Sequence, residues 1–224
     1  MVRRTFIESA LDGLERVHNF VLYETRSVVV GGYSVHFTAA MTEVGVTIVK
    51  TGETTRYYMN GVLGRDGDMP SIEWGDGMKS WYIGGELGRA DGRPTVTYAA
   101  GKQEWHVNGK LGRLGGLPAV VFPNGSQLWY TDGKLDRPED KPAAIYANGT
   151  KLWYTDGVLD REGDNPAVMR SDGTNEWWVK DVLHREHGRP AVEWANGEKE
   201  WHVHGQEITE EQAAFIAAIS LLNM

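Results

Sequence analysis

Apolar and polar positions recur along this chain with a period of 24 residues. Each repeat contains a proline, a small residue, an apolar residue and, two places later, usually an aromatic residue, as in the segment from Pro142 to Tyr146. Apolar side chains two residues apart lie on one face of a β-strand. Asn-Gly or Asp-Gly follows in most repeats, and this dipeptide is the strongest local signal for a hairpin turn. The pattern therefore predicts a β-hairpin in every repeat.

Three columns of the repeat each hold one residue type. Arginine, proline and tryptophan recur at intervals of 24 residues, with the prolines running from Pro70 to Pro190. A fixed period of this length is typical of repeat proteins, in which each unit stacks on its neighbours. We therefore expect these columns to be structural: Arg65, Arg89, Arg113, Arg137, Arg161 and Arg185, with Trp81, Trp105, Trp129, Trp153, Trp177 and Trp201.

A second turn dipeptide lies eight residues beyond the first, and a leucine and the column arginine follow it. Two turns per repeat predict two strands, with the proline at a kink in the longer one. Two-residue turns at both sites would place the apolar position, the aromatic residue and the tryptophan on one face. The expected cross-strand pairs are Tyr146 with Lys151, Ala144 with Trp153, and Tyr130 with Leu135.

The two ends of the chain depart from the repeat. Residues 6–22 carry apolar residues at helical spacing, and residues 28–37 predict a hairpin across Gly31-Gly32. Near the other end, Thr209 to Gln212 form a capping box before an apolar helix. We expect the helices to cover the ends of the sheet, or alternatively to mediate homo-oligomers. The expected domains are a helix and hairpin cap over 1–45, six to seven hairpin repeats over 46–208, and a C-terminal helix over 209–224.

The segment from Gly149 to Gly173 resembles the MORN repeat, with Trp153 at the aromatic position of that family and Asp156-Gly157 at its turn. It is more similar to a MORN-like variant, W-Y-x-N-G-x-L-H-R-x-x-G-P-A, of large viruses, phages and some bacteria. Leu183-His184-Arg185 spells the LHR form of that variant in full. The resemblance covers residues 46–208 and implies an all-β, elongated, single-layer ribbon of hairpins. It also implies a scaffold or binding module of viral or phage origin, since MORN proteins mostly have such roles.

Composition narrows the function classes. The 224 residues have a net charge of −8 and no cysteine, so disulfides are excluded and direct binding of nucleic acid is disfavoured. The chain has no signal peptide and no apolar run of 18 residues, which favours a cytoplasmic protein without a membrane span, in the host cytoplasm if it is viral. Besides a protein-binding module, two alternatives stay open. One is an acidic inhibitor or antitoxin that mimics nucleic acid and blocks a basic groove. The other is a lipid-associated protein, which the lack of a basic face disfavours.

The sequence contains no catalytic constellation. It has no G-x-S-x-G elbow and no phosphate loop, so we expect neither an enzyme nor a cofactor. The column arginines are suited to grip phosphates or carboxylates, but the acids that follow most of them favour a role in tying loops together. The loop from Arg113 to Pro118 has no acid. His184, His187, His202 and His204 lie close in the chain and leave a metal site open, although structural roles are favoured and we assign no metal.

The exceptions to a column are better functional clues than its members, because stacking requires the members. In the fifth repeat Arg170 replaces the aromatic residue, Trp178 replaces Tyr or His, and Lys180-Asp181 replaces the second turn dipeptide. A single layer cannot bury both faces, so either the tyrosine face or the tryptophan face is expected to be partly open. We expect a partner-binding patch of aromatic and polar residues. Its predicted members are Arg170, Trp178, Lys180, Asp181, His184, Tyr130 and Tyr154.

Overall fold

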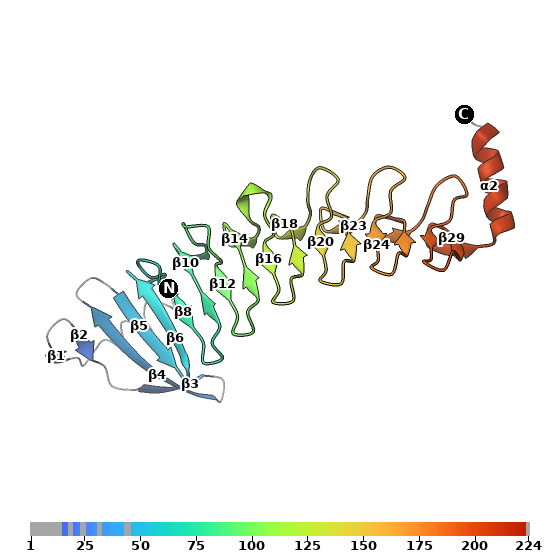
Figure 1. Ribbon diagram of the computed structural model, residues 1–224. Coiled ribbons are helices and arrows are strands. Elements are labelled where there is room, and N and C mark those ends of the chain that lie inside the picture. Colours follow the sequence, from blue (N-terminus) through green and yellow to red (C-terminus); the bar gives the residue numbers. More distant parts are fainter. Residues whose placement is uncertain (1–14, 18–19, 23–25, 31–32, 43–45, 223–224) are drawn as a thin grey trace. The chain divides into compact units, whose positions relative to one another are not determined.

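The computed structural model describes residues 15–17, 20–22, 26–30, 33–42 and 46–222 (Figure 1). Contacts within the chain divide it into two units, residues 1–109 and residues 110–224. Both units consist of antiparallel hairpins, and the helix α2 (Glu210–Leu222) ends the second. The all-β hairpin architecture expected from the sequence is therefore confirmed. The expected domain boundaries at residues 45 and 208 stay predictions.

The first unit begins with longer strands than the repeats have. Its central strand β4 pairs with β2, β3 and β5, and β5 pairs in turn with β6. The expected hairpin is confirmed, since Val30 at the end of β3 pairs with Tyr33 at the start of β4. These strands are β1 (Glu15–Val17), β2 (Phe20–Leu22), β3 (Arg26–Val30), β4 (Tyr33–Thr42), β5 (Val46–Thr51) and β6 (Thr54–Met59).

The helix expected over residues 6–22 is wrong where the structure describes that segment. Residues 15–17 and 20–22 form the strands β1 and β2, which pair with each other, and β2 also pairs with β4. Phe20, Val21 and Leu22 suit a strand as well as a helix, and pairing with a neighbouring strand decides between the two. Residues 6–14 lie outside the described residues.

The repeats of the first unit continue its sheet. β6 pairs with β8, β8 with β9, β9 with β12, and β12 with β13, while β10 and β11 form a separate short hairpin. The elements are β7 (Val62–Leu63), β8 (Ile72–Glu73), β9 (Lys79–Ser80), β10 (Tyr82–Ile83), β11 (Glu86–Leu87), β12 (Val96–Thr97), β13 (Gln103–Glu104) and β14 (His106–Val107).

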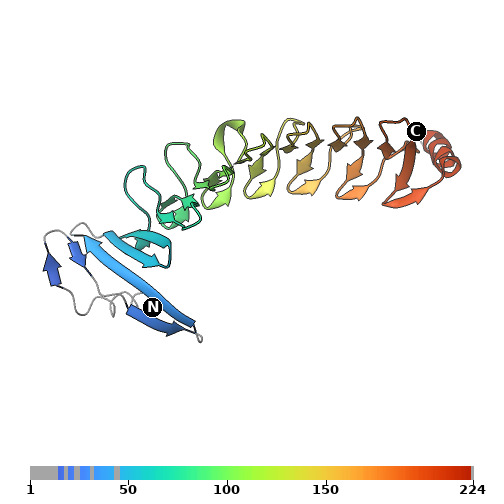
Figure 2. The same cartoon turned by 60° about the horizontal axis from the view of Figure 1, so that its bottom comes forward.

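The second unit repeats one plan of four short strands, and Figures 1 and 2 show its hairpins in a regular row. The two strands on either side of the first turn of each repeat pair with those of the next repeat, and together they form one antiparallel sheet from β16 to β29. The two strands on either side of the second turn form a separate two-stranded sheet, as in β18–β19, β22–β23 and β26–β27. The elements before the Trp153 repeat are β15 (Lys110–Leu111), the 3₁₀ helix η1 (Leu114–Gly116), β16 (Val120–Val121), β17 (Gln127–Leu128), β18 (Tyr130–Thr131) and β19 (Lys134–Leu135). The later ones are β20 (Ala144–Ile145), β21 (Lys151–Leu152), β22 (Tyr154–Thr155), β23 (Val158–Leu159), β24 (Val168–Met169), β25 (Asn175–Glu176), β26 (Trp178–Val179), β27 (Val182–Leu183), β28 (Val192–Glu193), β29 (Lys199–Val203) and β30 (Gln206–Ile208).

The first turn of the repeat is one residue longer than expected. The amide of Tyr146 donates to the carbonyl of Thr150 at 2.9 Å, and the amide of Gly149 donates to the carbonyl of Tyr146 at 2.8 Å. Gly149 has a φ of 93°, which fits a three-residue loop with a glycine bulge. The side chain of Asn148 caps the loop by accepting the amide of Thr150.

This longer turn makes the expected register wrong by one residue. Ala144 pairs with Leu152, and Ile145 pairs with Lys151. The second turn has the expected two residues, because Asp156 and Gly157 both have positive φ, at 58° and 88°. The expected pairing of Tyr130 with Leu135 is confirmed.

The corrected register separates the aromatic residue and the tryptophan onto opposite faces, since cross-strand partners project to the same side and neighbours alternate. In the second unit we call the tryptophan side the closed face; it holds the column tryptophans and arginines and the alanines Ala119, Ala143, Ala167 and Ala191. These alanines are fully buried, and Trp153 is 7% exposed. We call the other side the open face. Its buried floor is formed by Val120, Ala144, Val168 and Val192. Its other members are Phe122, Leu128, Tyr130, Tyr146, Leu152, Tyr154, Arg170, Glu176, Trp178, Trp194, Glu200 and His202.

The C-terminal helix α2 begins at the expected capping box. The side chain of Thr209 accepts the amide of Gln212, and the side chain of Gln212 accepts the amide of Thr209. Ala213 is buried against Gly188, where an added Cβ would lie 2.1 Å from the carbonyl oxygen of Ala213. The helix therefore covers the last hairpins of the second unit (Figure 2). In the described part of the chain, no helix is long and apolar enough to cross a membrane.

Candidate functional site

A clamp built from tryptophan and arginine recurs on the closed face. The indole Nε1 of Trp153 donates to the carbonyl of Asp140 at 3.0 Å, which fixes the preceding loop. The guanidinium of Arg161 stacks on the Trp153 ring at 3.9 Å, and its Nη1 donates to the carbonyl of Pro166 at 3.0 Å. Each clamp therefore ties the loop before it to the loop after it. The same stacking occurs for Arg65 on Tyr57, Arg89 on Trp81, Arg137 on Trp129 and Arg185 on Trp177.

A carboxylate completes the clamp in several repeats. The Nε and Nη2 of Arg161 donate to the two oxygens of Asp140 at 2.7 and 2.9 Å. Arg185 holds Asp164 in the same way, at 2.8 and 3.0 Å. In both carboxylates the hydrogen bond from the arginine lowers the pKa below its ordinary value. The contacts agree with the loop-tying role that the acids indicated.

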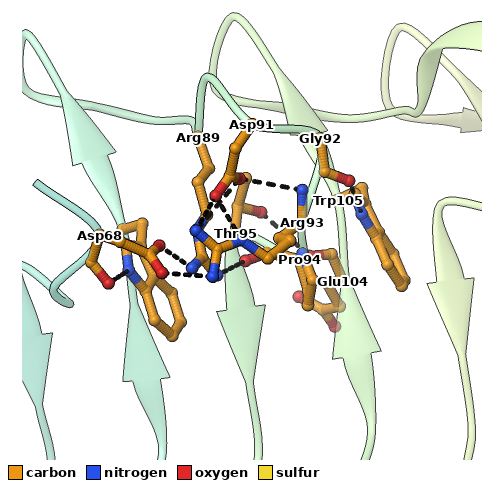
Figure 3. Close-up of polar contacts among 10 residues, drawn as sticks. Asp68, Arg89, Asp91, Gly92, Arg93, Pro94, Thr95, Glu104 and Trp105 are labelled. Carbon is orange, nitrogen blue, oxygen red and sulfur yellow. Dashed lines mark hydrogen bonds and ion pairs between the residues drawn. The ribbon is translucent and has the colours of Figure 1, made fainter.

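The first unit shows a two-cation form of this clamp (Figure 3). The carboxylate of Asp68 lies between Arg89 and Arg93, and it contacts both guanidinium groups. Arg93 also contacts Asp91 in its own loop. Asp164 in the second unit has the same surroundings, because Arg189 joins Arg185 on it.

The acid-free loop after Arg113 is held by its backbone. The indole Nε1 of Trp129 donates to the carbonyl of Gly116 at 2.9 Å. Gly116 occupies the position that Asp140 and Asp164 hold in the following repeats, so the loop contributes no side-chain oxygen to the clamp.

The aromatic residues of the open face are partly exposed. Tyr146 is 42% exposed, whereas the column tryptophan of the same repeat is buried. Partial burial raises the pKa of Tyr154, and the neighbouring Tyr146, Asp181 and Tyr130 raise it further. Since the tryptophan side is closed by arginines and loops, the tyrosine side is the open one of the two faces. The aromatic stripe expected from the sequence lies there.

Two glutamates, the buried Glu176 and the half-buried Glu200, organise the open face in the fifth and sixth repeats. Arg170 forms an ion pair with Glu176, which also accepts the indole Nε1–H of Trp178 at 2.9 Å. In the next repeat Glu200 accepts the indole Nε1–H of Trp194 at 3.0 Å. Sequence reasoning missed these glutamates, although the signal was present, because Leu128 and Leu152 hold the same column in the earlier repeats.

The structure brings four of the predicted patch residues to the open face: Arg170, Trp178, Tyr130 and Tyr154. Lys180 and Asp181 lie instead at the exposed second turn of the fifth repeat, where both have positive φ, at 51° and 62°. Such a conformation is strained for residues other than glycine. The carboxylate of Asp181 accepts the amide of Leu159 at 2.8 Å, which links the turn to the previous repeat.

His184 lies apart from the other predicted patch residues. It is 5% exposed, its ring stacks on His204 with centroids 4.6 Å apart, and its Nδ1 accepts the amide of His204. Asp160 and Asp136 accept the corresponding amides one and two repeats earlier, respectively. His184 is therefore a link between repeats and not a surface residue. Among the described residues, no group of three or more His, Cys, Asp or Glu side chains is arranged to hold a metal ion.

These observations define an all-β hairpin-repeat protein with one face closed by tryptophan–arginine clamps and one aromatic face left open. Comparisons with protein-family models, with curated proteins and with solved structures found no match to this chain. The likeness to the MORN family therefore stays a prediction from the repeat motif.

Proposed function

We propose that this protein is a non-enzymatic binding module or scaffold that holds a protein partner on the open face of its second unit. The observation that carries the proposal is the asymmetry of the two faces. Tyr146 and Trp194 are 42% and 39% exposed, while Trp129, Trp153 and Trp177 on the other side are buried. Tyrosine and tryptophan give large contact areas at a low entropy cost, which is why they are enriched in protein interfaces.

The composition of this face indicates the mode of contact. The third and fourth repeats present Tyr130, Tyr146 and Tyr154 around Leu128 and Leu152, with no charge among them. In the fifth repeat the charge of Arg170 is matched by Glu176. A partner would therefore dock mainly through apolar and aromatic contacts, with Arg170 and Trp178 as polar anchors at one side.

Capture of partners from the native host tests the proposal. The proteins recovered by the tagged wild type and by the tagged double variant Tyr146→Ala/Tyr154→Ala are compared by quantitative mass spectrometry. The recovered partner is then purified and titrated against both, which gives the two affinities. We expect the variant to lower the affinity at least about tenfold, since two central aromatic side chains of an interface typically contribute 2 kcal/mol or more.

Lys151→Ala is the matched control, because Lys151 is exposed next to Leu152 in β21 and projects to the opposite face. It is expected to bind like the wild type, and thermal unfolding of all variants verifies that they are folded. Equal partner recovery by wild type and the double variant would exclude the open face as the docking surface.

An acidic inhibitor that blocks a basic groove is the second candidate function. Exposed carboxylates recur at the second turns of the second unit, at Asp132, Asp156 and Asp181, and the chain has a net charge of −8. Binding through such a row would weaken steeply between about 50 and 300 mM salt. Docking on the aromatic face would change little over the same range, so a salt titration of the recovered complex separates the two candidates.

A further inference from the structure

The clamp around Trp129 differs by one side chain from the two clamps that follow it along the chain. In the next two repeats an aspartate, Asp140 or Asp164, fills the fork of the column arginine with two parallel hydrogen bonds. The corresponding residue of the preceding loop is Gly116, which has a φ of 70° and no atom within 4 Å of the position of an added Cβ. The carboxylate position of this clamp is therefore open.

Arg137 is held ready for a carboxylate at that position. Its guanidinium stacks on the Trp129 ring at 3.8 Å, and its Nη1 donates to the carbonyl of Pro142 at 3.3 Å, as in the filled clamps. Among the described residues Arg137 forms no ion pair, and partial burial lowers its pKa, with only Glu139 opposing that effect.

A second cation stands at the same repeat position as in the Asp164 clamp, whereas the Asp140 clamp has Asn165 there. Lys141 corresponds to Arg189, which contacts Asp164 together with Arg185. In this structure the ammonium of Lys141 contacts Glu139, and it is more than half exposed. A carboxylate bound to Arg137 would thus have the ammonium of Lys141 at the repeat position from which Arg189 contacts Asp164.

We propose that Arg137 and Lys141 form a binding site for a carboxylate that comes from outside the chain. The bidentate geometry of the neighbouring clamps sets the chemistry, because a planar fork matches a planar carboxylate. The loop that contains Gly116 also carries two exposed apolar side chains, because Leu114 and Leu117 are 79% and 50% exposed. The site therefore favours a carboxylate attached to an apolar group. It lies on the closed face and is independent of the docking surface proposed above.

The test follows the arginine Nε–H and indole Nε1–H signals by NMR during titration with sodium acetate and sodium 3-methylbutanoate. We expect saturable shifts at Arg137 and Trp129 but not at Arg161 or Arg185, and tighter binding of 3-methylbutanoate by about threefold or more. Sodium phosphate is the third titrant, and binding at Arg137 as tight as that of acetate would overturn the assignment to carboxylates.

Two variants exchange the filled and open clamps. Gly116→Asp introduces a tethered carboxylate, which the positive φ of this position permits, since Asp140 has a φ of 51° at the same place in its loop. We expect it to weaken acetate binding at Arg137 at least about fivefold, because a tethered group competes at high effective concentration. Asp140→Gly is expected to give Arg161 the acetate response that Arg137 has in the wild type.

Two short peptides distinguish the sources of the carboxylate: one has an internal glutamate and an amidated C-terminus, and the other has a free C-terminal leucine and no acidic side chain. The peptide that binds more tightly at Arg137 identifies a side-chain or a C-terminal carboxylate as the ligand. The proposal fails if no carboxylate shifts the Arg137 signal, or if the shift is unchanged in Gly116→Asp. Neither outcome bears on the proposal that a protein partner docks on the open face, because that proposal is tested by the partner affinity of the open-face variants.

Discussion

The two faces of the second unit are made by the same strands, yet the aromatic side chains are buried on one face and partly exposed on the other. On the closed face Trp153 is buried under Arg161, and its indole N–H donates to a backbone carbonyl. On the open face, one residue further along the chain, Tyr154 is only partly covered. The closed face therefore provides the stability of the array, and the open face is the one free to contact a partner. Three comparisons between the faces test this division.

The largest difference is expected between two neighbouring aromatic residues. Trp153→Ala should lower the free energy of unfolding by about 3–5 kcal/mol, because it leaves a cavity in the core and removes the platform of Arg161. Tyr154→Ala should cost about 1 kcal/mol, since its side chain is only partly removed from water. Urea unfolding followed by circular dichroism measures both. Equal losses would show that the open face contributes to the core as much as the closed face does.

A smaller difference is expected between two arginines on opposite faces. Arg161 has a side chain 13% exposed, stacks on a tryptophan and binds Asp140 with two hydrogen bonds, whereas Arg170 is 50% exposed and pairs with Glu176. Arg161→Lys keeps the charge but loses the planar fork, and we expect a loss of about 1 kcal/mol. Arg170→Lys should change the free energy of unfolding by less than about 0.5 kcal/mol. A larger effect of Arg170→Lys would reverse the assigned roles.

The sequence predicted the hairpin repeat well because the period of 24 residues repeats both turn signals and the strand alternation between them. It did not predict the register, because the same Asn-Gly dipeptide suits two turns. In the first turn Asn148 caps the loop with its side chain and only the glycine bulges, whereas in the second both residues adopt positive φ. Pro123 carried a usable signal: it precedes Asn124 in the first turn of its repeat, where a proline suits a type I turn.

The candidate site was predicted in part for a related reason. The column exceptions Arg170 and Trp178 do share the open face with Tyr130 and Tyr154. His184 is also an exception to its column, which holds Asp136 and Asp160, but it is buried because its Nδ1 replaces their carboxylates as an acceptor. A substitution that keeps the hydrogen-bonding role looks the same in sequence as one that creates a contact surface. Only the three-dimensional partners distinguish them.

The smallest expected difference between the faces is in their response to acid. The hydrogen bond from Arg185 lowers the pKa of Asp164, so the folded state favours its carboxylate form. The stability that this contributes is complete above the ordinary aspartate pKa of about 3.9 and is lost as the pH falls through the lower value of the folded state. Because the Asp164 side chain is 37% exposed, we expect it to contribute less than about 1 kcal/mol.

Thermal unfolding of wild type and Asp164→Asn between pH 6 and 2.5 measures this contribution. The wild type should be the more stable protein near pH 6. The gap should begin to narrow below about pH 4 and should close as the pH falls through the lowered pKa of Asp164, where the wild-type carboxylate also becomes neutral. Tyr154→Phe is the control on the open face, because a phenol does not titrate in this range and its curve should run parallel to that of the wild type. A gap between wild type and Asp164→Asn that persists at pH 2.5 would mean that Asp164 stabilises its loop by shape and not by its charge on Arg185.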